Sequence, residues 1–390
     1  MTKVGILTYH NNENKGAILQ AYCLQEAVKS IFSVKVEIIE YRTVSKEKNR
    51  RNSIFITKHP RNIISSMADK NISEEFFQSN LSLSDNSITT DDHEKAVNWI
   101  KQQDYDIIIT GSDEIWKVNN DTGIYNWFFP SRPFPNLYSL DPRITAVKVA
   151  YAASANETNP RDLSKETLDT LKKHISSYDY ISVRDKHTQD LVADIGIKSV
   201  YKVPDPTILE DIPTRNTTPI LERNGVDTSQ PILGFHSQGG DQVFESICEQ
   251  YRHRGFQVVT PTSASYADVE LAGKLNPFEY YSVYDEFDMM VTSSLHSTIF
   301  SIKQNTPFVT VDYNPVYKDL ESKTHSLLAD FDLLDRHINA LNRNKSQIHY
   351  IVKKSETINN KEKIMDKVSQ LREEGINFLE MVNEEYEKNK

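Results

Sequence analysis

Short apolar runs alternate with helix-like segments along the first half of the chain. Residues 4–7 form an apolar run, a polar turn follows, and residues 17–29 carry apolar side chains on one face, as an amphipathic helix does. Residues 34–41 are the next apolar run. Such runs are typical of parallel strands that are buried on both faces. Further strands are predicted at 106–110, 147–153, 180–183 and 199–203, and helices at 95–102, 164–177 and 191–196.

The same alternation restarts in the second half. A stretch rich in Pro, Thr, Asn and Asp is interpreted as a linker over 213–230, between an N-terminal α/β domain at 1–212 and a C-terminal α/β domain at 231–360. Two such halves predict an α/β fold of two Rossmann-like domains that face each other across a cleft, a GT-B-like arrangement. A variable excursion is predicted at about 42–90, and a C-terminal amphipathic helix at 361–390. Strands of the second half are predicted at 232–235, 257–260, 289–292 and 308–312, and helices at 242–252, 277–283, 296–303 and 320–330.

Composition narrows the class of protein. The chain has 390 residues, more than one hydrophobic core usually serves, and 38% of them are hydrophobic. A formal net charge of -10 argues against a nucleic-acid partner, although a few converging cations still suffice for a small anion. The two cysteines, Cys23 and Cys248, lie far apart, so neither a disulfide framework nor a metal-ligand cluster is expected.

No apolar segment resembles a signal peptide or a membrane span. We therefore expect a cytoplasmic protein, with a place at the inner face of the membrane left open. The basic residues of the excursion are the feature that would favour peripheral membrane contact, although a charge run is usually only solvated.

Polar residues follow several of the predicted strands. In open α/β sheets ligands bind beyond the carboxyl ends of the strands, so these residues are the candidates for chemistry. The first half supplies Asn14, Lys15, Gly16, Ser112, Asp113, Arg184 and Asp205, and the second half supplies His236, Ser293, Ser294, His296 and Ser297.

Each candidate also has a purely structural interpretation. Ser112 and Asp113 suit helix caps, Arg184 suits a surface salt bridge, and Asp205 between two prolines suits a turn. Lys15 can simply be solvated, and a single histidine after a strand is usually structural. Their repeated position at strand ends in both halves is what favours a functional site.

Five short segments, in this order, resemble those of polysaccharide pyruvyl transferases. They are 14–21 (NKGAILQA), 111–116 (GSDEIW), 181–185 (ISVRD), 204–207 (PDPT) and 292–301 (TSSLHSTIFS). Two departures occur: Ser297 stands where the family usually has Gly, and Glu114-Ile115 fill variable positions.

The resemblance implies a GT-B-like fold and transfer of pyruvate from phosphoenolpyruvate to two hydroxyls of a sugar, giving a ketal. The sugar would belong to a cell-surface polysaccharide or a lipid-linked oligosaccharide precursor. His296 would bind phosphoenolpyruvate and transfer a proton, Arg184 would hold its carboxylate or phosphate, and Asp113 and Asp205 are candidate bases. Substrate binding is further assigned to Ser293, Ser294, Ser297, Asn14, Lys15, Gly16, Ser112 and His236. Neither a cofactor nor a metal is expected, and the oligomeric state is not predicted.

Two other functions stay open at this point. A GT-B glycosyltransferase with a nucleotide-sugar donor would want basic residues near Gly239 and Gly240, and none is adjacent. A non-catalytic glycan-binding relative would have no need to keep His296, Arg184 and Asp113. Tyr280, Tyr281 and Tyr284 suit sugar stacking, although core packing is the commoner role of such residues.

Overall fold

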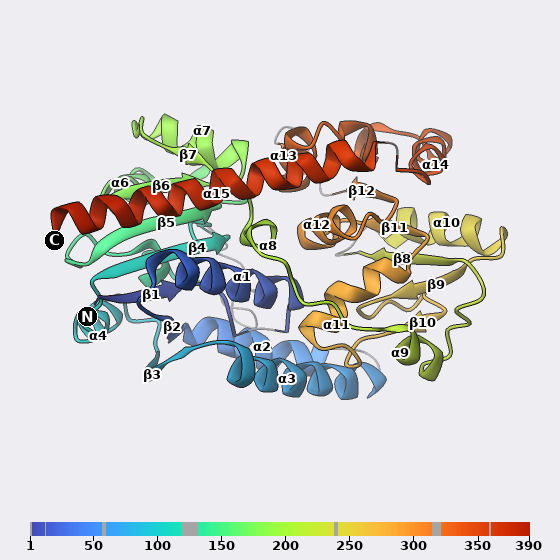
Figure 1. Cartoon of the computed structure of the whole chain (residues 1–390), viewed down its shortest axis with the longest axis horizontal. Coiled ribbons are helices and arrows are strands. Elements are labelled where there is room, and N and C mark those ends of the chain that lie inside the picture. The colour runs from blue at the N-terminus through green and yellow to red at the C-terminus, as the bar shows by residue number, and fades with distance from the viewer. Residues whose placement is uncertain are drawn as a thin grey trace. The chain divides into compact units, whose positions relative to one another are not determined.

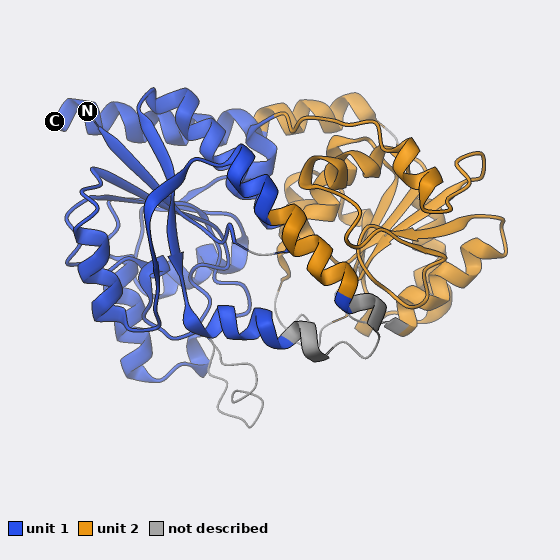
Figure 2. Cartoon of the chain, turned by 90° about the horizontal axis from the view of Figure 1, so that it is seen from below, with its two compact units in different colours: residues 1–63, 74–210, 371–390 blue, residues 64–73, 211–370 orange. Residues whose placement is uncertain are grey.

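In the computed structural model, the chain folds into two compact units (Figures 1 and 2). It describes residues 2–11, 13–56, 60–118, 132–237, 241–313, 321–358 and 360–390, and their side chains except those of 53–56, 60–62 and 241. Unit 1 comprises Met1–Ile63, Glu74–Glu210 and Leu371–Lys390. Unit 2 comprises Ile64–Ser73 and Asp211–Gln370.

Unit 1 is built on a parallel sheet whose described strands run in the order β3-β2-β1-β4-β5-β6-β7. Because all neighbouring strands are parallel, their carboxyl ends share one edge, at which the chain turns into helices. The strands are β1 (Lys3–Leu7), β2 (Lys35–Arg42), β3 (Leu83–Thr89), β4 (Ile107–Asp113), β5 (Val147–Ala153), β6 (Tyr180–Val183) and β7 (Tyr201–Lys202). The helices are α1 (Lys15–Phe32), α2 (Val44–Ile56), α3 (Pro60–Asn80), α4 (His93–Lys101), α6 (Lys165–Ile175), α7 (Lys186–Asp194) and α8 (Pro206–Leu209), with the 3-10 turn η1 (Leu137–Ser139).

The core of unit 1 follows the apolar pattern of the central strands. Ile108 and Ala150 lie on adjacent strands of the sheet and pack with Leu171 and Leu191 from α6 and α7. These helices begin at polar caps: the side chain of Ser164 accepts from the amide of the third residue of α6, and Asp185 does the same for α7.

Unit 2 repeats this design with the strand order β10-β9-β8-β11-β12-β13, again parallel throughout the described strands. Leu233, Phe235, Met289, Val291 and Val309 fill its core. The strands are β8 (Ile232–His236), β9 (Gln257–Thr260), β10 (Val269–Glu270), β11 (Met289–Thr292), β12 (Phe308–Asp312) and β13 (His337–Asn339). The helices are α9 (Thr218–Arg223), α10 (Asp241–Arg252), α11 (Pro277–Ser282), α12 (Leu295–Lys303), α13 (Lys323–Asp330) and α14 (Lys345–Lys354), and the C-terminal helix is α15 (Lys361–Asn389).

The α/β class and its alternating elements are confirmed, and one region differs from expectation. The segment at about 42–90, expected as an excursion, contains α2, α3 and the edge strand β3. The sequence pattern does not predict β3, because its central residues 84–87 are all polar. The strand lies at the edge of the sheet, where little apolar surface is needed. Residues 64–73 of α3 belong to unit 2.

The units divide after Glu210. The stretch 213–230, interpreted as a linker, lies in unit 2 and contains α9. Helix α15 is assigned to unit 2 up to Gln370 and to unit 1 from Leu371. Among the residues described, none of the helices has both the length and the apolar character that crossing a bilayer requires.

Candidate functional site

Arg184 is the centre of a buried polar cluster in unit 1. It directly follows β6, and its side chain is 4% exposed. Its Nη1 donates to Asp205 Oδ2 at 2.9 Å, and Asp113 Oδ1 lies 3.7 Å from Nη2. Nη1 also lies within hydrogen-bond distance of Ser112 Oγ (3.3 Å) and Gln20 Oε1 (3.4 Å). The fold therefore brings together four residues singled out in the sequence, and it adds Gln20 from α1.

One edge of this guanidinium makes no hydrogen bond within the described residues. Within the described part of the chain, Arg184 Nε and Nη2 are buried and have no hydrogen-bond partner. Burial alone would lower the pKa of Arg184, but the carboxylates of Asp205, Asp113 and Asp185 raise it above its usual value. The group is therefore a fixed cation with a fork geometry that matches a carboxylate or a phosphate.

The two candidate carboxylates differ in how far they are engaged. Asp205 is 1% exposed, and its Oδ1 accepts from the backbone N (3.0 Å) and Oγ1 (2.7 Å) of Thr207 while Oδ2 accepts from Arg184. Asp113 ends β4 and its side chain is 21% exposed. Asp205 thus caps α8 and orients Arg184, whereas Asp113 is the carboxylate with solvent access.

The turn before α1 is organised by its own side chain. Asn14 Oδ1 accepts from the backbone N of Gly16 (3.0 Å) and of Ala17 (3.3 Å). These amides at the start of α1 are therefore engaged by the cap. Lys15 is buried as the first residue of α1, and Gln20, five residues on, is the part of this helix that reaches Arg184.

Cations and aromatic rings also gather at Tyr9, which follows β1. Lys46 Nζ lies 3.9 Å from the centroid of the Tyr9 ring, and the Arg132 guanidinium carbon lies 4.9 Å from it. Burial lowers the pKa of Lys46, which Asp113 and Glu114 partly offset, and burial lowers the pKa of Arg132 to about 10. Sequence reasoning missed this group, because cation–ring pairs between distant segments leave no local pattern.

In unit 2, His236 ends β8, and its Nδ1 lies beside two hydroxyl groups. Tyr284 OH donates to Ser297 Oγ at 2.6 Å, and Ser297 Oγ lies 2.8 Å from His236 Nδ1. Tyr280 OH lies 3.2 Å from the same nitrogen. Burial raises the pKa of both tyrosines, so both stay hydroxyl donors.

His296 lies in the first turn of α12, directly after β11. Its side chain is buried, and its ring centroid is 6.2 Å from that of Phe300. Ser294 is the N-cap residue, and within the described residues its side chain makes no cap hydrogen bond. The amide of Ser293 donates to the His236 carbonyl at 3.0 Å, so the loop after β11 is tied to the end of β8. The amides at the start of α12 are therefore not covered by a side-chain cap, and such helix starts favour anions.

Comparison with solved structures shows the fold. The UDP-GlcNAc 2-epimerase from Methanocaldococcus jannaschii is 9% identical with a TM-score of 0.55, over 90% of this chain and 92% of that chain. A structure of that organism's enzyme in complex with UDP-GlcNAc and UDP is 10% identical with a TM-score of 0.50, over 92% and 94%. A putative UDP-N-acetylglucosamine 2-epimerase from Listeria monocytogenes is 10% identical with a TM-score of 0.49, over 95% and 90%. The GT-B-like α/β fold expected from the sequence is confirmed.

The family follows from the sequence match. No curated protein matches the chain. Residues 14–315 match the family model described as polysaccharide pyruvyl transferase, and they include Asn14, Asp113, Arg184, His236 and His296. The match extends over well more than half of the chain. The chain therefore belongs to the polysaccharide pyruvyl transferase family, a family of transferases that act in polysaccharide pyruvylation.

Proposed function

We propose that this transferase moves pyruvate from phosphoenolpyruvate to two hydroxyls of one sugar, in a cell-surface polysaccharide or its lipid-linked precursor. The observation that carries the proposal is the start of α12, where His296 lies in a first turn whose N-cap side chain makes no cap bond within the described residues. Backbone N–H groups and the helix dipole favour a phosphate at such a position. Phosphoenolpyruvate is the donor that brings a phosphate to a pyruvyl transferase.

Arg184 supports the same donor chemistry in unit 1. Its Nε and Nη2, without partners within the described part of the chain, offer two parallel donors to the carboxylate or the phosphate of phosphoenolpyruvate. Asp205 is a positioning residue in this proposal, because both of its oxygens are already engaged.

The reaction needs a proton at carbon and a base at oxygen. Protonation of the methylene carbon gives a methyl group and an oxocarbenium-like centre, which a first sugar hydroxyl attacks. Phosphate leaves with its bonding electron pair, and a second hydroxyl closes the ketal as both hydroxyl protons are released. We assign the carbon protonation to His296, because an imidazole can act as a general acid, and hydroxyl deprotonation to Asp113, the more exposed carboxylate.

His236 is assigned to the donor side, where its ring supplies a hydrogen-bonding group for phosphoenolpyruvate. The hydroxyl groups of Ser297 and Tyr280 lie beside its Nδ1 and orient the ring. The acceptor is met in the cytoplasm or at the inner face of the membrane in this proposal, and the rings and cations around Tyr9 in unit 1 suit a sugar with an anionic group.

The test is phosphate release from phosphoenolpyruvate over a panel of acceptor glycans. The His296→Ala variant should lose at least about 100-fold in rate, since general acid catalysis and anion binding both depend on that side chain. His253→Ala is the matched control, because His253 is an exposed histidine of unit 2, and its rate should equal that of the wild type.

Calorimetry separates the donor classes. Binding of phosphoenolpyruvate by the wild type, weakened in Arg184→Ala, is the expected result. Tight binding of a nucleotide sugar with no binding of phosphoenolpyruvate would contradict the proposal and favour a glycosyltransferase.

A further inference from the structure

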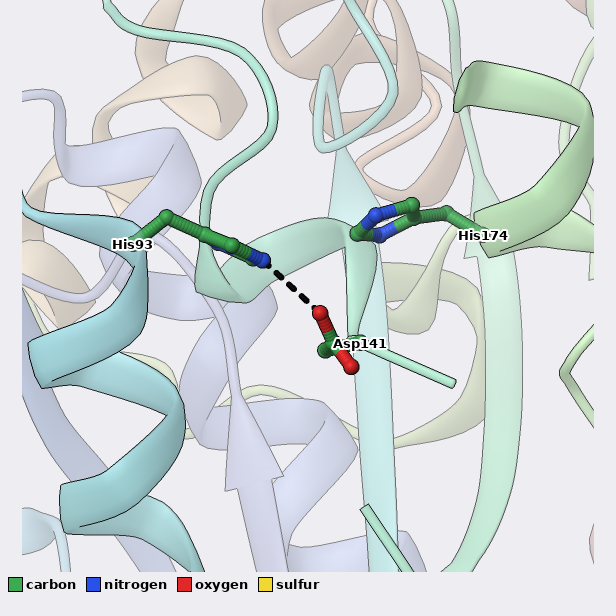
Figure 3. Close-up of side chains that lie close together, drawn as sticks. All are labelled: His93, Asp141 and His174. Atoms are coloured by element: carbon green, nitrogen blue, oxygen red, sulfur yellow. Dashed lines mark hydrogen bonds and ion pairs between the residues drawn. The ribbon is translucent and has the colours of Figure 1, made fainter. Parts of the chain in front are cut away.

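Three potential metal ligands converge in unit 1, away in sequence from the pyruvyl transferase motifs. His93 is the first residue of α4, Asp141 follows η1, and His174 lies in the last turn of α6 (Figure 3). One ligand atom of each lies within 4.8 Å of the other two. Zn²⁺ bonds of roughly 2.0–2.2 Å in a tetrahedral site place ligand atoms about 3.4 Å apart, so modest side-chain rotation closes the site.

The carboxylate of Asp141 is held in a fixed orientation. Its Oδ1 accepts from the Arg143 backbone N and Nε, both at 2.8 Å, and its Oδ2 accepts from Arg143 Nη2 at 2.9 Å. A carboxylate accepts about four hydrogen bonds, and the fourth direction, from Oδ2, points to His93 Nε2 at 2.9 Å. One lone pair of the carboxylate is therefore directed into the cluster.

His174 is in the form that binds metals. Ser139 Oγ donates to the carbonyl of Asn136 at 2.9 Å, so its hydrogen is used there. Ser139 Oγ and O lie 3.3 and 3.4 Å from His174 Nδ1, and both are then acceptors. The proton of His174 therefore sits on Nδ1, and Nε2 keeps its lone pair.

His93 completes the set with a less constrained ring. Its Nδ1 is buried and has no hydrogen-bond partner within the described residues, so Asp141 is the contact that orients the ring. Its side chain is 18% exposed, so solvent reaches part of the ring. The alternative is a closed His93–Asp141–Arg143 network that only stabilises the fold. That network gives no reason for a second neutral imidazole, His174, at a centroid distance of 5.6 Å.

We propose that His93, Asp141 and His174 bind one divalent transition-metal ion of the Zn²⁺ class, with water in the remaining position. Two imidazoles and one carboxylate suit Zn²⁺ and its neighbours in the first row and disfavour Mg²⁺, which prefers oxygen ligands. The ion would join α4, the segment after η1 and α6 in unit 1. This site requires no contact with the residues assigned to pyruvyl transfer.

The experiment is a titration of the chelator-treated full-length chain with Zn²⁺ by calorimetry, and with Co²⁺ by visible absorption. We expect one equivalent to bind, with Co²⁺ bands of a four-coordinate site and no comparable binding of Mg²⁺. His93→Ala and His174→Gln should each weaken Zn²⁺ binding at least about tenfold, whereas the control His253→Ala should not.

Far-UV circular dichroism checks that each variant folds, and His93→Ala, at the more exposed ligand, is the variant expected to keep the fold. Absence of stoichiometric Zn²⁺ binding by the wild type would overturn the proposal. So would unchanged binding in a folded His93→Ala variant. Because the readout is metal binding and not activity, it is independent of the outcome for phosphoenolpyruvate.

Discussion

At the scale of single residues, several residues of the family-like segments form hydrogen bonds with one another. Arg184, Asp205 and Ser112 were predicted as candidates from their positions after strands, and the fold places them within one hydrogen-bonded cluster. Gln20 was not predicted as a site residue, because it meets Arg184 across a long stretch of sequence. Tyr284 was considered for sugar stacking or core packing and not for its hydroxyl contact with Ser297. A strand end is a local signal in the sequence, whereas a hydrogen-bond partner supplied by another helix is not. The roles assigned to these residues stay predictions.

Ser297 is the departure from the family pattern, and its hydroxyl links Tyr284 to His236. Removing it in Ser297→Ala leaves a buried tyrosine hydroxyl without its acceptor and His236 Nδ1 without its nearest donor. We expect kcat/KM for phosphoenolpyruvate to fall about tenfold, the effect of losing roughly 1–2 kcal/mol of hydrogen bonding.

Steady-state kinetics with Ser301→Ala as the control checks this prediction. Ser301 lies one turn further along α12, and its hydroxyl donates to the carbonyl of Ser297. Equal kinetics for Ser297→Ala and the wild type would show that the Ser297 hydroxyl does not support donor binding through His236.

Glu40 provides a pH-dependent contribution to stability in unit 1. Burial would raise its pKa, but contacts with His10 and Arg42 lower the pKa below the ordinary value of 4.5. Because the folded-state pKa is the lower one, this stability is present above the unfolded-state pKa and is lost as pH falls through the folded-state pKa.

Glu40→Gln should therefore reduce the free energy of unfolding at pH 7 by about 1 kcal/mol, since the site is partly solvated. The difference from the wild type should narrow as pH falls below about 4.5. Urea unfolding curves across this pH range measure it. A difference that stays constant with pH would show that the Glu40 charge is not involved.

At the scale of elements, the buried central strands were predictable, whereas the edge strands β3, β10 and β13 and several helices were not. Buried parallel strands such as β4 and β11 are continuous apolar runs, which are easy to locate. Helices α2 and α3 and strand β3 lie in the polar excursion. Elements that lie at an edge or are partly exposed need no regular apolar pattern, so they are hard to locate in the sequence. Helix α15 was expected from its amphipathic pattern. That pattern does not show that a glycine, Gly375, packs against the interior of unit 1.

Gly375 in α15 lies close to the interior of unit 1. A Cβ at this position would lie 2.5 Å from both Leu209 Cδ2 and Tyr151 OH, and Tyr151 is fully buried. Gly→Ala in an exposed helix normally stabilises by roughly 0.5–1 kcal/mol, but overpacking typically costs about 1–3 kcal/mol, so Gly375→Ala should be destabilising.

Thermal or urea unfolding tests the sign of this change. Glu373→Ala, at an exposed position of the same helix, should change the free energy of unfolding by no more than about 0.5 kcal/mol. A stabilised Gly375→Ala variant would show that the helix shifts freely at this contact.

At the scale of the whole molecule, the sequence sufficed for the class and the fold. Length and alternation predicted two α/β halves, and the two parallel sheets confirm them. The division of the chain was harder to foresee, because residues 64–73 of α3 join unit 2 and residues 371–390 join unit 1. Contacts between distant segments decide such assignments, and they follow from the folded state and not from local composition.

The proposed pyruvyl transfer is tested most directly by mass spectrometry. An acceptor glycan is incubated with the protein and phosphoenolpyruvate in D₂O, and its mass is then measured. The account predicts a mass gain of one pyruvate less one water, with one deuterium in the new methyl group, and one phosphate released for each ketal formed. A product that gains a sugar from a nucleotide-sugar donor, or a ketal whose methyl group carries no deuterium, would contradict it.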